Sequence, residues 1–272
     1  MGVKGLWSIL EPASVSCNLE DLKGQTLAVD LGGWVVSMSK INVANVHLRN
    51  LFHRTVILLH HQVNLIFILE GTVPKLKYEV FDERIVRNST NTENKESGSS
   101  VEIPRRSQFN AILRECEQML TLLGCHCIKG AGEAEALCAL LDLHGLVDGC
   151  ITDDIDAFLY GAKVVYRNFT LKKCAGMQKY CYEAMENKLQ LNREKLVALA
   201  VLIGCDYLPK GVPGVGIEKA VKLVKVDTSS ILKKFEEWTN AEYGQSLEEI
   251  RQKAKKGKHC TNCQHLGKVT SG

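Results

Sequence analysis

Acidic residues directly follow short apolar runs in this chain, and this arrangement restricts the folds that the chain can adopt. Asp30 follows the apolar run 26–29, and Glu70 follows the apolar run 65–69. Apolar runs of this length without alternation are typical of buried parallel strands. Parallel strands place their carboxyl ends at one edge of an open α/β sheet, where such folds bind ligands. We therefore expect an α/β fold whose functional residues gather at that edge.

Seven acidic positions stand next to apolar or glycine-rich runs: Asp30, Glu70, Glu133, Glu135, Asp154, Asp156 and Asp206. Seven carboxylates in one place repel each other unless cations compensate them, and Mg²⁺ is a hard cation that prefers oxygen ligands. Two-metal nucleases hold two such ions about 3.5–4 Å apart. Asp154 and Asp156 can face one ion pair from a loop, and we place Glu133 and Glu135 at a loop-to-helix junction. A single acid of this kind is more often a helix cap or a solvated group, so the prediction depends on the whole set.

The composition is typical of one large domain or two small ones. The 272 residues are 45% apolar and 24% charged, which allows a sizeable core, and a net charge of +3 decides little about partners. Eleven cysteines, scattered through apolar runs, favour buried thiols in a reducing compartment over a disulfide framework. The N-terminus has no hydrophobic signal region and no apolar run approaches the length of a membrane span, so we expect no membrane partner.

Strand and helix patterns alternate along the chain. We expect strands at 26–30, 63–69, 125–128, 149–152 and 164–167, and helices at 47–62, 75–87, 109–123, 133–145 and 192–203. This alternation predicts a mostly parallel central sheet that is flanked by helices on both faces. After residue 206 the chain turns helical again.

A polar tract at 88–100 interrupts this alternation. It contains no apolar residue, and Arg84 and Arg87 precede it while Arg105 and Arg106 follow it. Such a composition is typical of a segment without a packed core. It is either a tolerated surface insertion or an element that becomes ordered on a polyanion.

The glycine-rich segment 211–216, Gly-Val-Pro-Gly-Val-Gly, opens the predicted helix 217–224. A turn of this kind presents backbone N–H groups to a phosphate, and a helix pair around it can bind duplex backbone without reading sequence. The alternative is an ordinary helix–helix turn. The glycine-rich segment directly follows the acidic segment around Asp206, and this position favours binding to the DNA backbone.

The last residues contain two weaker signals. Arg251, Lys253, Lys255, Lys256 and Lys258 form a basic stretch that either contacts phosphates or makes the tail soluble. Cys260 and Cys263, flanked by two histidines, have the spacing of half a zinc site, but the sequence offers no second half.

Six segments resemble, in the same order, the motifs of the XPG/flap-endonuclease superfamily. They are residues 1–7 (Met-Gly-Val-Lys-Gly-Leu-Trp), 28–30 (Ala-Val-Asp), 132–136 (Gly-Glu-Ala-Glu-Ala), 152–156 (Thr-Asp-Asp-Ile-Asp), 204–207 (Gly-Cys-Asp-Tyr) and 211–216. Within the superfamily the chain is similar to the GEN branch, the eukaryotic Holliday-junction resolvases. This similarity rests on residues 69–71, 160–170 and 205–216.

The resemblance implies a PIN-like nuclease core and a helical helix-two-turn-helix subdomain. It implies a structure-selective, Mg²⁺-dependent endonuclease that cuts branched DNA, meaning four-way junctions as well as 5′ flaps and forks, and leaves a 5′ phosphate. The seven acids would hold two Mg²⁺ ions, which Mn²⁺ can replace. Asp30, Glu133 and Asp154 would be the catalytic acids, and Lys77 and Arg84 would face the scissile phosphate.

The resemblance also implies a DNA-binding surface and a division into regions. The implied DNA-binding residues are Gly2, Lys77, Arg84, Gly211, Val212, Gly214, Gly216 and Lys219, with room for a monovalent cation at the glycine turn. The implied regions are an N-terminal nuclease region 1–87, a polar and basic segment 88–108, an internal nuclease region 109–206, a helix-two-turn-helix subdomain 207–250 and a basic tail 251–272.

Two features depart from the family's pattern. The GEN branch continues after its nuclease core into a chromodomain and a long tail, so we expect this sequence to be a shortened form. Gly32 and Gly33 stand where we expect bulkier residues, which predicts looser packing beside Asp30.

Three functions stay open at this stage. The first is a nuclear junction resolvase, with regulated access from the cytoplasm, that forms a homodimer on a four-way junction. The second is a flap or bubble endonuclease, which needs a helical arch; the tract 88–100 is too polar for a stable arch. The third is a non-cutting junction binder, which would not need the complete acid set.

Overall fold

The computed structural model describes residues 2–3, 5–38, 45–72, 74, 77, 106–169, 177–226 and 231–239. Seven strands form one sheet: β1 (Ser14–Cys17), β2 (Thr26–Asp30), β3 (Asn64–Leu69), β4 (His126–Lys129), β5 (Gly149–Ile151), β6 (Val164–Arg167) and β7 (Met177–Cys181). Their order is β1-β7-β6-β5-β2-β3-β4. The strands from β6 to β4 run parallel, and β7 runs antiparallel to both of its neighbours. The mostly parallel sheet predicted from the sequence is confirmed.

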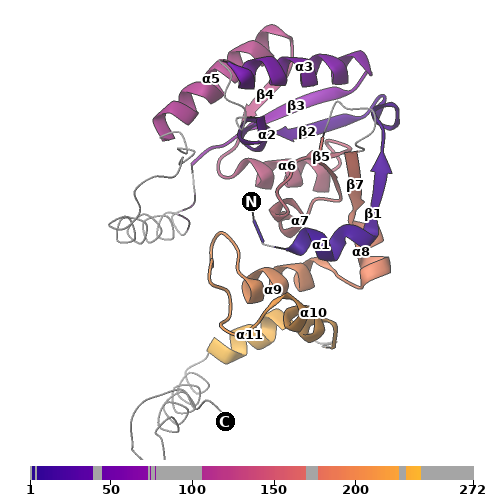
Figure 1. Cartoon of the computed structure of the whole chain (residues 1–272), viewed down its shortest axis with the longest axis vertical. Coiled ribbons are helices and arrows are strands. Elements are labelled where there is room, and N and C mark those ends of the chain that lie inside the picture. Colours follow the sequence, from indigo (N-terminus) through magenta and orange to yellow (C-terminus); the bar gives the residue numbers. More distant parts are fainter. Residues whose placement is uncertain are drawn as a thin grey trace, which may run out of the picture. The chain divides into compact units, whose positions relative to one another are not determined.

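Helices cover both faces of this sheet. The helices within the described residues are α1 (Leu6–Leu10), α2 (Leu31–Met38), α3 (Val46–His60), α5 (Arg106–Leu122), α6 (Ala134–Leu143), α7 (Asp156–Tyr160), α8 (Tyr182–Leu189), α9 (Arg193–Ile203), α10 (Ile217–Val226) and α11 (Ile231–Thr239), with short 3₁₀ turns at Glu11–Ala13 and Leu19–Leu22. Figure 1 shows α3 and α5 on one face of the sheet and α6 on the other. No helix in the described parts of the chain is long and apolar enough to cross a bilayer.

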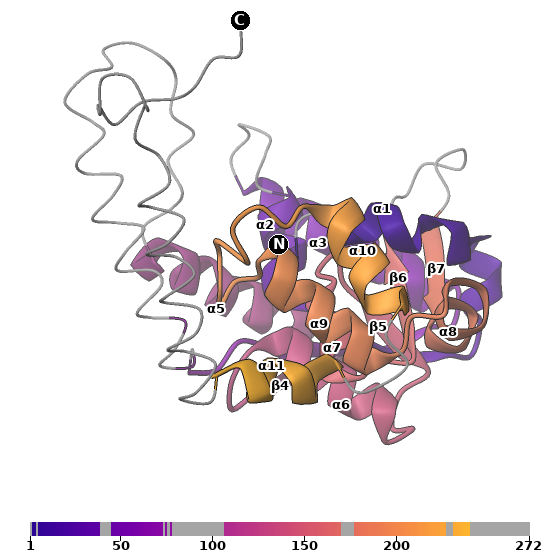
Figure 2. The same ribbon diagram turned by 90° about the horizontal axis from the view of Figure 1, so that it is seen from below.

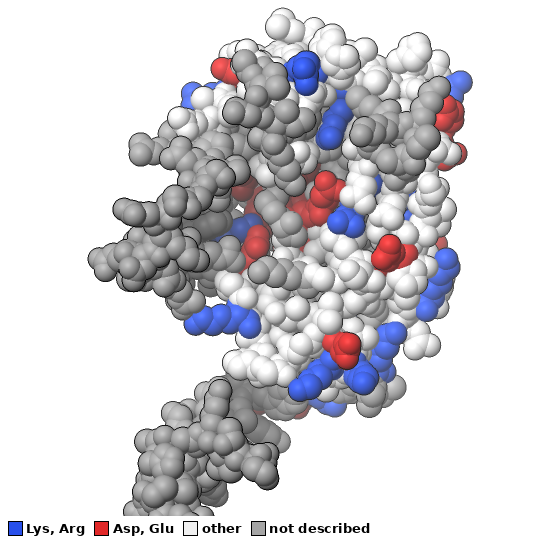
Figure 3. Space-filling view, in the orientation of Figure 1, with Lys and Arg blue, Asp and Glu red and all other residues white. Residues whose placement is uncertain are grey.

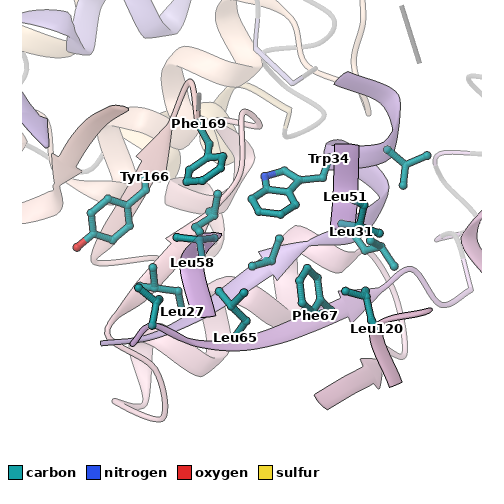
Figure 4. Packing of buried hydrophobic residues seen from close by; sticks show 14 of the residues in the cluster. Leu27, Leu31, Trp34, Leu51, Leu58, Leu65, Phe67, Leu120, Tyr166 and Phe169 are labelled. Carbon is teal, nitrogen blue, oxygen red and sulfur yellow. The ribbon is translucent and has the colours of Figure 1, made fainter. Parts of the chain in front are cut away.

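The main core lies under α2, α3 and α5. Leu27 of β2 and Phe67 of β3 are fully buried there, against Leu51 and Leu58 of α3. Figure 4 shows these side chains together with Trp34 and Phe169, which close one end of the cluster. The continuous apolar runs of β2 and β3 are explained by this burial, because helices cover both faces of these strands.

The order of the strands creates a switch point between β2 and β5. From β2 the chain moves outward to β3 and β4, and after α6 it returns to the other side of β2 to form β5 and then β6. In open α/β sheets, the crevice for ligands lies outside the carboxyl ends of the strands at such a point. Asp30 ends β2, and Asp154 follows β5 by three residues, so two predicted ligands flank the switch point.

Two strands were missed by the sequence patterns. β7 has the mixed sequence Met-Gln-Lys-Tyr-Cys, and β1 has the sequence Ser-Val-Ser-Cys with two exposed residues in its middle. Both lie at one end of the sheet, where a strand does not need a continuous apolar run. They pair with each other in the register Ser14 to Tyr180 and Cys17 to Met177.

The chain divides into two compact units, residues 1–225 and residues 226–272. Within the first unit, α9 packs beside α7 and α10 begins beside the N-terminal segment, as Figure 2 shows. Asn192 caps α9 by accepting a hydrogen bond from the Lys195 backbone N–H at 2.9 Å. In the second unit the structure describes only α11.

Candidate functional site

Asp30 occupies the end of β2 and is almost fully buried. Its Oδ1 accepts the Gly33 backbone N–H at 2.9 Å, and its Oδ2 accepts the Thr152 hydroxyl at 3.3 Å. Burial raises the pKa of Asp30 to about 6, against the effect of the Gly33 hydrogen bond, and the charge of Asp154 adds to the rise. A Cβ on Gly33 would stand 2.4 Å from Asp30 Oδ2, so glycine packs tightly against the carboxylate here. The looser packing expected beside Asp30 is not found.

Thr152 joins Asp30 to the acids that follow β5. Its hydroxyl oxygen accepts the Asp154 backbone N–H at 3.1 Å, and Asp154 Oδ1 in turn accepts the Asp156 backbone N–H at 3.1 Å. Asp156 is the first residue of α7, whereas we expected it on the loop. This chain of bonds holds Asp154 and Asp156 on one side of the loop despite their separation of two residues.

The carboxylate of Asp156 lacks a full set of hydrogen-bond partners among the described residues. Its side chain is buried, and its Oδ1 has no hydrogen-bond partner within the described part of the chain. Burial raises the pKa of Asp156 to about 7, and the charges of Asp154 and Asp206 contribute to the rise. A buried carboxylate oxygen without a donor is costly, and a bound cation is one way in which proteins resolve that cost.

Gly2 lies directly against these two acids. A Cβ at Gly2 would stand 2.4 Å from Asp154 Oδ1 and 2.5 Å from Asp156 Oδ1, and the backbone has φ +75° there. Both observations restrict the position to glycine. The structure thus places Gly2, which the resemblance gave as a DNA-binding residue, beside the acid cluster.

Glu133 is the N-cap residue of α6, and its side chain is the centre of a second network. Lys77 Nζ forms an ion pair with Glu133 Oε1 and lies 3.4 Å from Asp206 Oδ2. The Tyr160 and Tyr207 hydroxyls donate to Glu133 Oε2 at 2.6 Å and 2.7 Å. Burial opposes ionisation of Glu133, but the bonds from Lys77 and the two tyrosines outweigh it and lower the pKa of this carboxyl. Glu133 is therefore held in its charged form.

The two remaining acids, Glu135 and Glu70, come from neighbouring segments. Glu135 lies in the first turn of α6, and burial raises its pKa to about 8, with contributions from the charges of Asp30 and Asp154. Glu70 is exposed directly after β3, and its charge raises the pKa of Asp30. The segment after β3 is bound to the segment before α6, because the Gly71 N–H donates to the Gly132 carbonyl at 2.8 Å. The acids thus surround one edge of the sheet, and Figure 3 shows acidic side chains gathered near the middle of the molecular face.

The side chains fit a hard divalent cation by their chemistry. All of the acids offer carboxylate oxygens, and several have pKa values raised by burial and by mutual repulsion, which is the condition that a cation relieves. Within the described residues, however, no three His, Cys, Asp or Glu side chains already stand in a metal-holding group. The Lys77 ammonium contacts both Glu133 and Asp206 and supplies positive charge beside these two acids.

The glycine turn lies between α9 and α10. Gly211 has φ +53°, and a Cβ there would stand 2.5 Å from the Leu202 carbonyl oxygen. The Val212 N–H donates to that same carbonyl at 2.8 Å, which fixes the turn on the end of α9. Gly214 and Gly216 are exposed, and Lys219 is exposed with its Nζ donating to the Gly214 carbonyl at 3.2 Å. The turn therefore presents backbone and one cation to solvent.

Some predicted residues lie outside the described part of the chain: Arg84, the tract 88–100, the basic stretch 251–258, and Cys260 with Cys263. Conversely, Thr152, Tyr160 and Tyr207 were not selected from the sequence, although they position the acids. Tyr207 directly follows Asp206, so its place beside a predicted ligand was the available signal. Tyr160 offered no such signal, because 27 residues separate it from Glu133.

Comparison with known proteins identifies the family. The XPG N-terminal domain matches residues 1–91 and the XPG I-region matches residues 124–206. Flap endonuclease GEN homolog 1 of mouse is 46% identical over 276 residues, which cover 98% of this chain and 29% of the mouse protein. The chain thus spans less than a third of the length of that relative.

Solved structures agree with this result. Human GEN1 in complex with Holliday junction DNA aligns with a TM-score of 0.72 at 40% identity, covering 98% of this chain and 69% of that one. The junction-resolving enzyme GEN1 in complex with product DNA and a Mg²⁺ ion aligns with a TM-score of 0.61 at 24% identity, covering 94% of this chain and 58% of that one, and shows the same fold. The chain therefore belongs to the XPG/flap-endonuclease superfamily, and its nuclease core is of the GEN type.

Proposed function

We propose that this protein is a structure-selective endonuclease that hydrolyses one phosphodiester bond near the branch of a DNA junction, flap or fork and leaves a 5′ phosphate. One observation carries the proposal. Acids from β2, from the loop after β5 and from the start of α6 meet at the switch point of the sheet, beside Lys77 and Gly2. A binding protein that does not cut DNA would gain nothing from several buried carboxylates that repel each other.

The acid set would hold two Mg²⁺ ions, with Mn²⁺ as a substitute. Asp30, Glu133 and Asp154 would be the central ligands, supported by Glu70, Glu135, Asp156 and Asp206. When bound, such ions supply a water of lowered pKa and stabilise the leaving oxygen in an in-line displacement. The Mg²⁺ ion in the solved GEN1–product structure supports this choice of metal.

The chain's own residues set the geometry of this site. Thr152 and Gly33 orient Asp30, while Tyr160 and Tyr207 keep Glu133 ionised and fix the direction of its carboxylate. Lys77 pairs with Glu133 and would face the negative charge of the scissile phosphate in a DNA complex. We propose the same role for Arg84, which lies outside the described residues.

The exposed glycine turn would contact the duplex next to the cut. Its free backbone groups and Lys219 suit contact with phosphates, which fixes the position of the protein without reading sequence. A monovalent cation could bind the carbonyl groups of the same turn. A duplex arm would then lie along α10, and the strand to be cut would enter the acid cluster.

We favour the four-way junction over a simple 5′ flap as the preferred substrate. The support comes from the GEN-type relatives, among them human GEN1 solved on Holliday junction DNA. The chain spans only part of those proteins. We propose that two copies assemble on one junction and cut it symmetrically. A nuclear location follows from this role as a further proposal.

The test uses matched labelled substrates in Mg²⁺: a mobile four-way junction, a 5′ flap, a fork and linear duplex. We expect paired, symmetric nicks in the junction and no cutting of linear duplex. Asp30→Asn should abolish cleavage, whereas Glu183→Gln, which makes the same change on the exposed face of α8, should not. Full activity of Asp30→Asn would refute the metal assignment. Cutting of the flap alone, with an uncut junction, would assign this core to the flap class.

A further inference from the structure

A cavity of about 480 Å³ lies on the α2 and α3 side of the sheet, next to the candidate active site. It is lined by aromatic, amide and hydroxyl side chains together with one arginine: Trp34, Phe169, Asn168, Gln178, Thr152 and Arg54. Ligand pockets for small organic molecules have volumes of about 300–1,000 Å³ and combine an apolar wall with a few polar groups. The volume and the lining of this cavity, the Arg54 pocket, are of that kind.

Arg54 is held in place by two aromatic rings. Its Cζ lies 5.2 Å from the Trp34 ring centroid and 5.6 Å from the Phe169 ring centroid, and the two rings stack at 5.3 Å with an interplanar angle of 30°. Figure 4 shows the two rings facing each other at the end of the core. A guanidinium that lies against aromatic faces keeps its N–H groups free in its own plane.

Arg54 is half-buried on the cavity wall, where Asp153 is the acid whose charge acts on it. Asp153 is shared with other groups, since its Oδ1 accepts the Asn168 N–H at 3.0 Å and lies 4.0 Å from Arg167 Nε. A half-buried guanidinium that lies against two aromatic rings, in a cavity of this size, is suited to an anion that arginine can bind in a bidentate manner, such as phosphate.

The opposite wall offers groups for the edge of a base. Gln178 Oε1 accepts both the Asn168 side-chain amide at 3.0 Å and the Tyr180 hydroxyl at 3.1 Å. Gln178 and Asn168 both line the cavity, and each amide carries donors and an acceptor. A donor and an acceptor that adjoin an aromatic wall match the hydrogen-bonding edge of an unstacked base.

Thr152 connects the cavity to the acid cluster. It lines the Arg54 pocket, and its hydroxyl donates to Asp30 Oδ2 at 3.3 Å. A group in the pocket is therefore separated from the candidate metal ligand by one side chain.

We propose that the Arg54 pocket binds one nucleoside monophosphate unit, with its phosphate on Arg54 and its base on the Asn168 and Gln178 side. Where the unit belongs to DNA, it is an unpaired nucleotide at the branch, and this part rests on the nuclease function proposed above. A free mononucleotide has the same chemistry, so the experiment separates the two sources.

The first arm is calorimetric titration of the whole chain in EDTA with dTMP, dAMP or inorganic phosphate. We expect the mononucleotides to bind more tightly than phosphate, and Arg54→Gln to weaken them about 10- to 100-fold, the usual effect of losing a hydrogen bond to a charged group. Gln178→Glu keeps the acceptor used by Asn168 and Tyr180 but adds a negative charge, so it should also weaken binding. Arg114→Gln, on the exposed face of α5, is the matched control and should change nothing.

The second arm compares, in EDTA, a fully paired junction with one that carries a single unpaired nucleotide at the branch. Tighter binding of the second junction, lost in Arg54→Gln but not in Arg114→Gln, assigns the pocket to DNA. Mononucleotide binding that depends on Arg54, without this preference among junctions, assigns it to free nucleotides. The proposal is overturned if folded Arg54→Gln matches the wild-type chain in both arms, or if phosphate alone binds as tightly as dTMP. Because neither arm needs cleavage, a failure of the nuclease proposal would be seen separately in the Mg²⁺ assay.

Discussion

Replacing Asp156 by asparagine should stabilise the metal-free fold while it removes activity. Asp156 is 4% exposed, and its Oδ1 has no hydrogen-bond partner within the described residues. Burial, with the charges of Asp154 and Asp206, raises its pKa from 3.8 to about 7. The folded state therefore binds the proton more tightly than the unfolded state, and the ionised carboxylate costs stability at neutral pH.

The size of the effect follows from the same pKa values. A rise from 3.8 to about 7 corresponds to about 4 kcal/mol at most when the carboxylate is ionised in both states. The negative charge of Asp156 also interacts favourably with the N-terminus of α7, which stabilises the folded wild-type chain by about 0.3–1 kcal/mol. Solvent and relaxation of the cluster reduce the remainder, so we expect Asp156→Asn to raise the free energy of unfolding by about 1–3 kcal/mol at pH 8.

The assay is urea denaturation in EDTA at pH 8 and at pH 5. The penalty at Asp156 is complete above the folded pKa and fades as the pH falls toward the unfolded pKa, so the gain should be smaller at pH 5 by roughly half. In Mg²⁺ the order should reverse, because a bound ion stabilises the wild-type cluster more than the variant. Asp153→Asn, an exposed acid in the same loop, is the control and should give no gain that depends on pH. A variant that is less stable at pH 8, or a gain that is equal at both pH values, would refute this reasoning.

Three further substitutions test other contacts. Gly2→Ala should reduce the cleavage rate by about 100-fold with little change in melting temperature. The new Cβ would displace the carboxylates of Asp154 and Asp156, and a displacement of about 1 Å is enough for such a loss. A near-normal cleavage rate would contradict the placement of Gly2. Tyr207→Phe should raise the pKa of Glu133, so the acidic limb of the cleavage pH profile should move to higher pH, and an unmoved limb would separate this tyrosine from the reaction. Asp142→Ala should lower the free energy of unfolding by about 2–4 kcal/mol, as measured by urea denaturation, because it removes the acceptor of two backbone N–H groups at the start of β6. A loss below about 1 kcal/mol would mean that water replaces the carboxylate.

The sequence predicted the centre of the sheet better than its antiparallel end. β2, β3 and β5 are covered on both faces, so their residues form continuous apolar runs that can be recognised without a structure. β1 and β7 are paired with each other at the far side of the sheet, and their alternation of polar and apolar residues is too short to separate them from loops. Helix α7 is only five residues long and begins with Asp156, so it was read as part of a loop.

The acids of the candidate site were recognisable because each stands at the end of a run whose direction the fold determines. The side chains that orient those acids were not recognisable, because each lies far in the sequence from the acid that it contacts. Thr152 is 122 residues from Asp30, and Tyr160 reaches Glu133 from a different helix. A threonine after a strand or a tyrosine at a helix end has many structural explanations, and only the arrangement of the folded chain selects one.

Lys77 shows what the resemblance alone did not reveal. The motif implies that this lysine faces a phosphate, whereas in the metal-free chain its ammonium stands between Glu133 and Asp206. A buried carboxylate cluster needs a counter-charge in every state of the protein, and Lys77 is the side chain that supplies it here. The ion pair with Glu133, which raises the pKa of Lys77, keeps the lysine charged throughout the physiological range. Glu133 and Asp206, which would help to hold a divalent ion, are thus the carboxylates that Lys77 contacts in this structure.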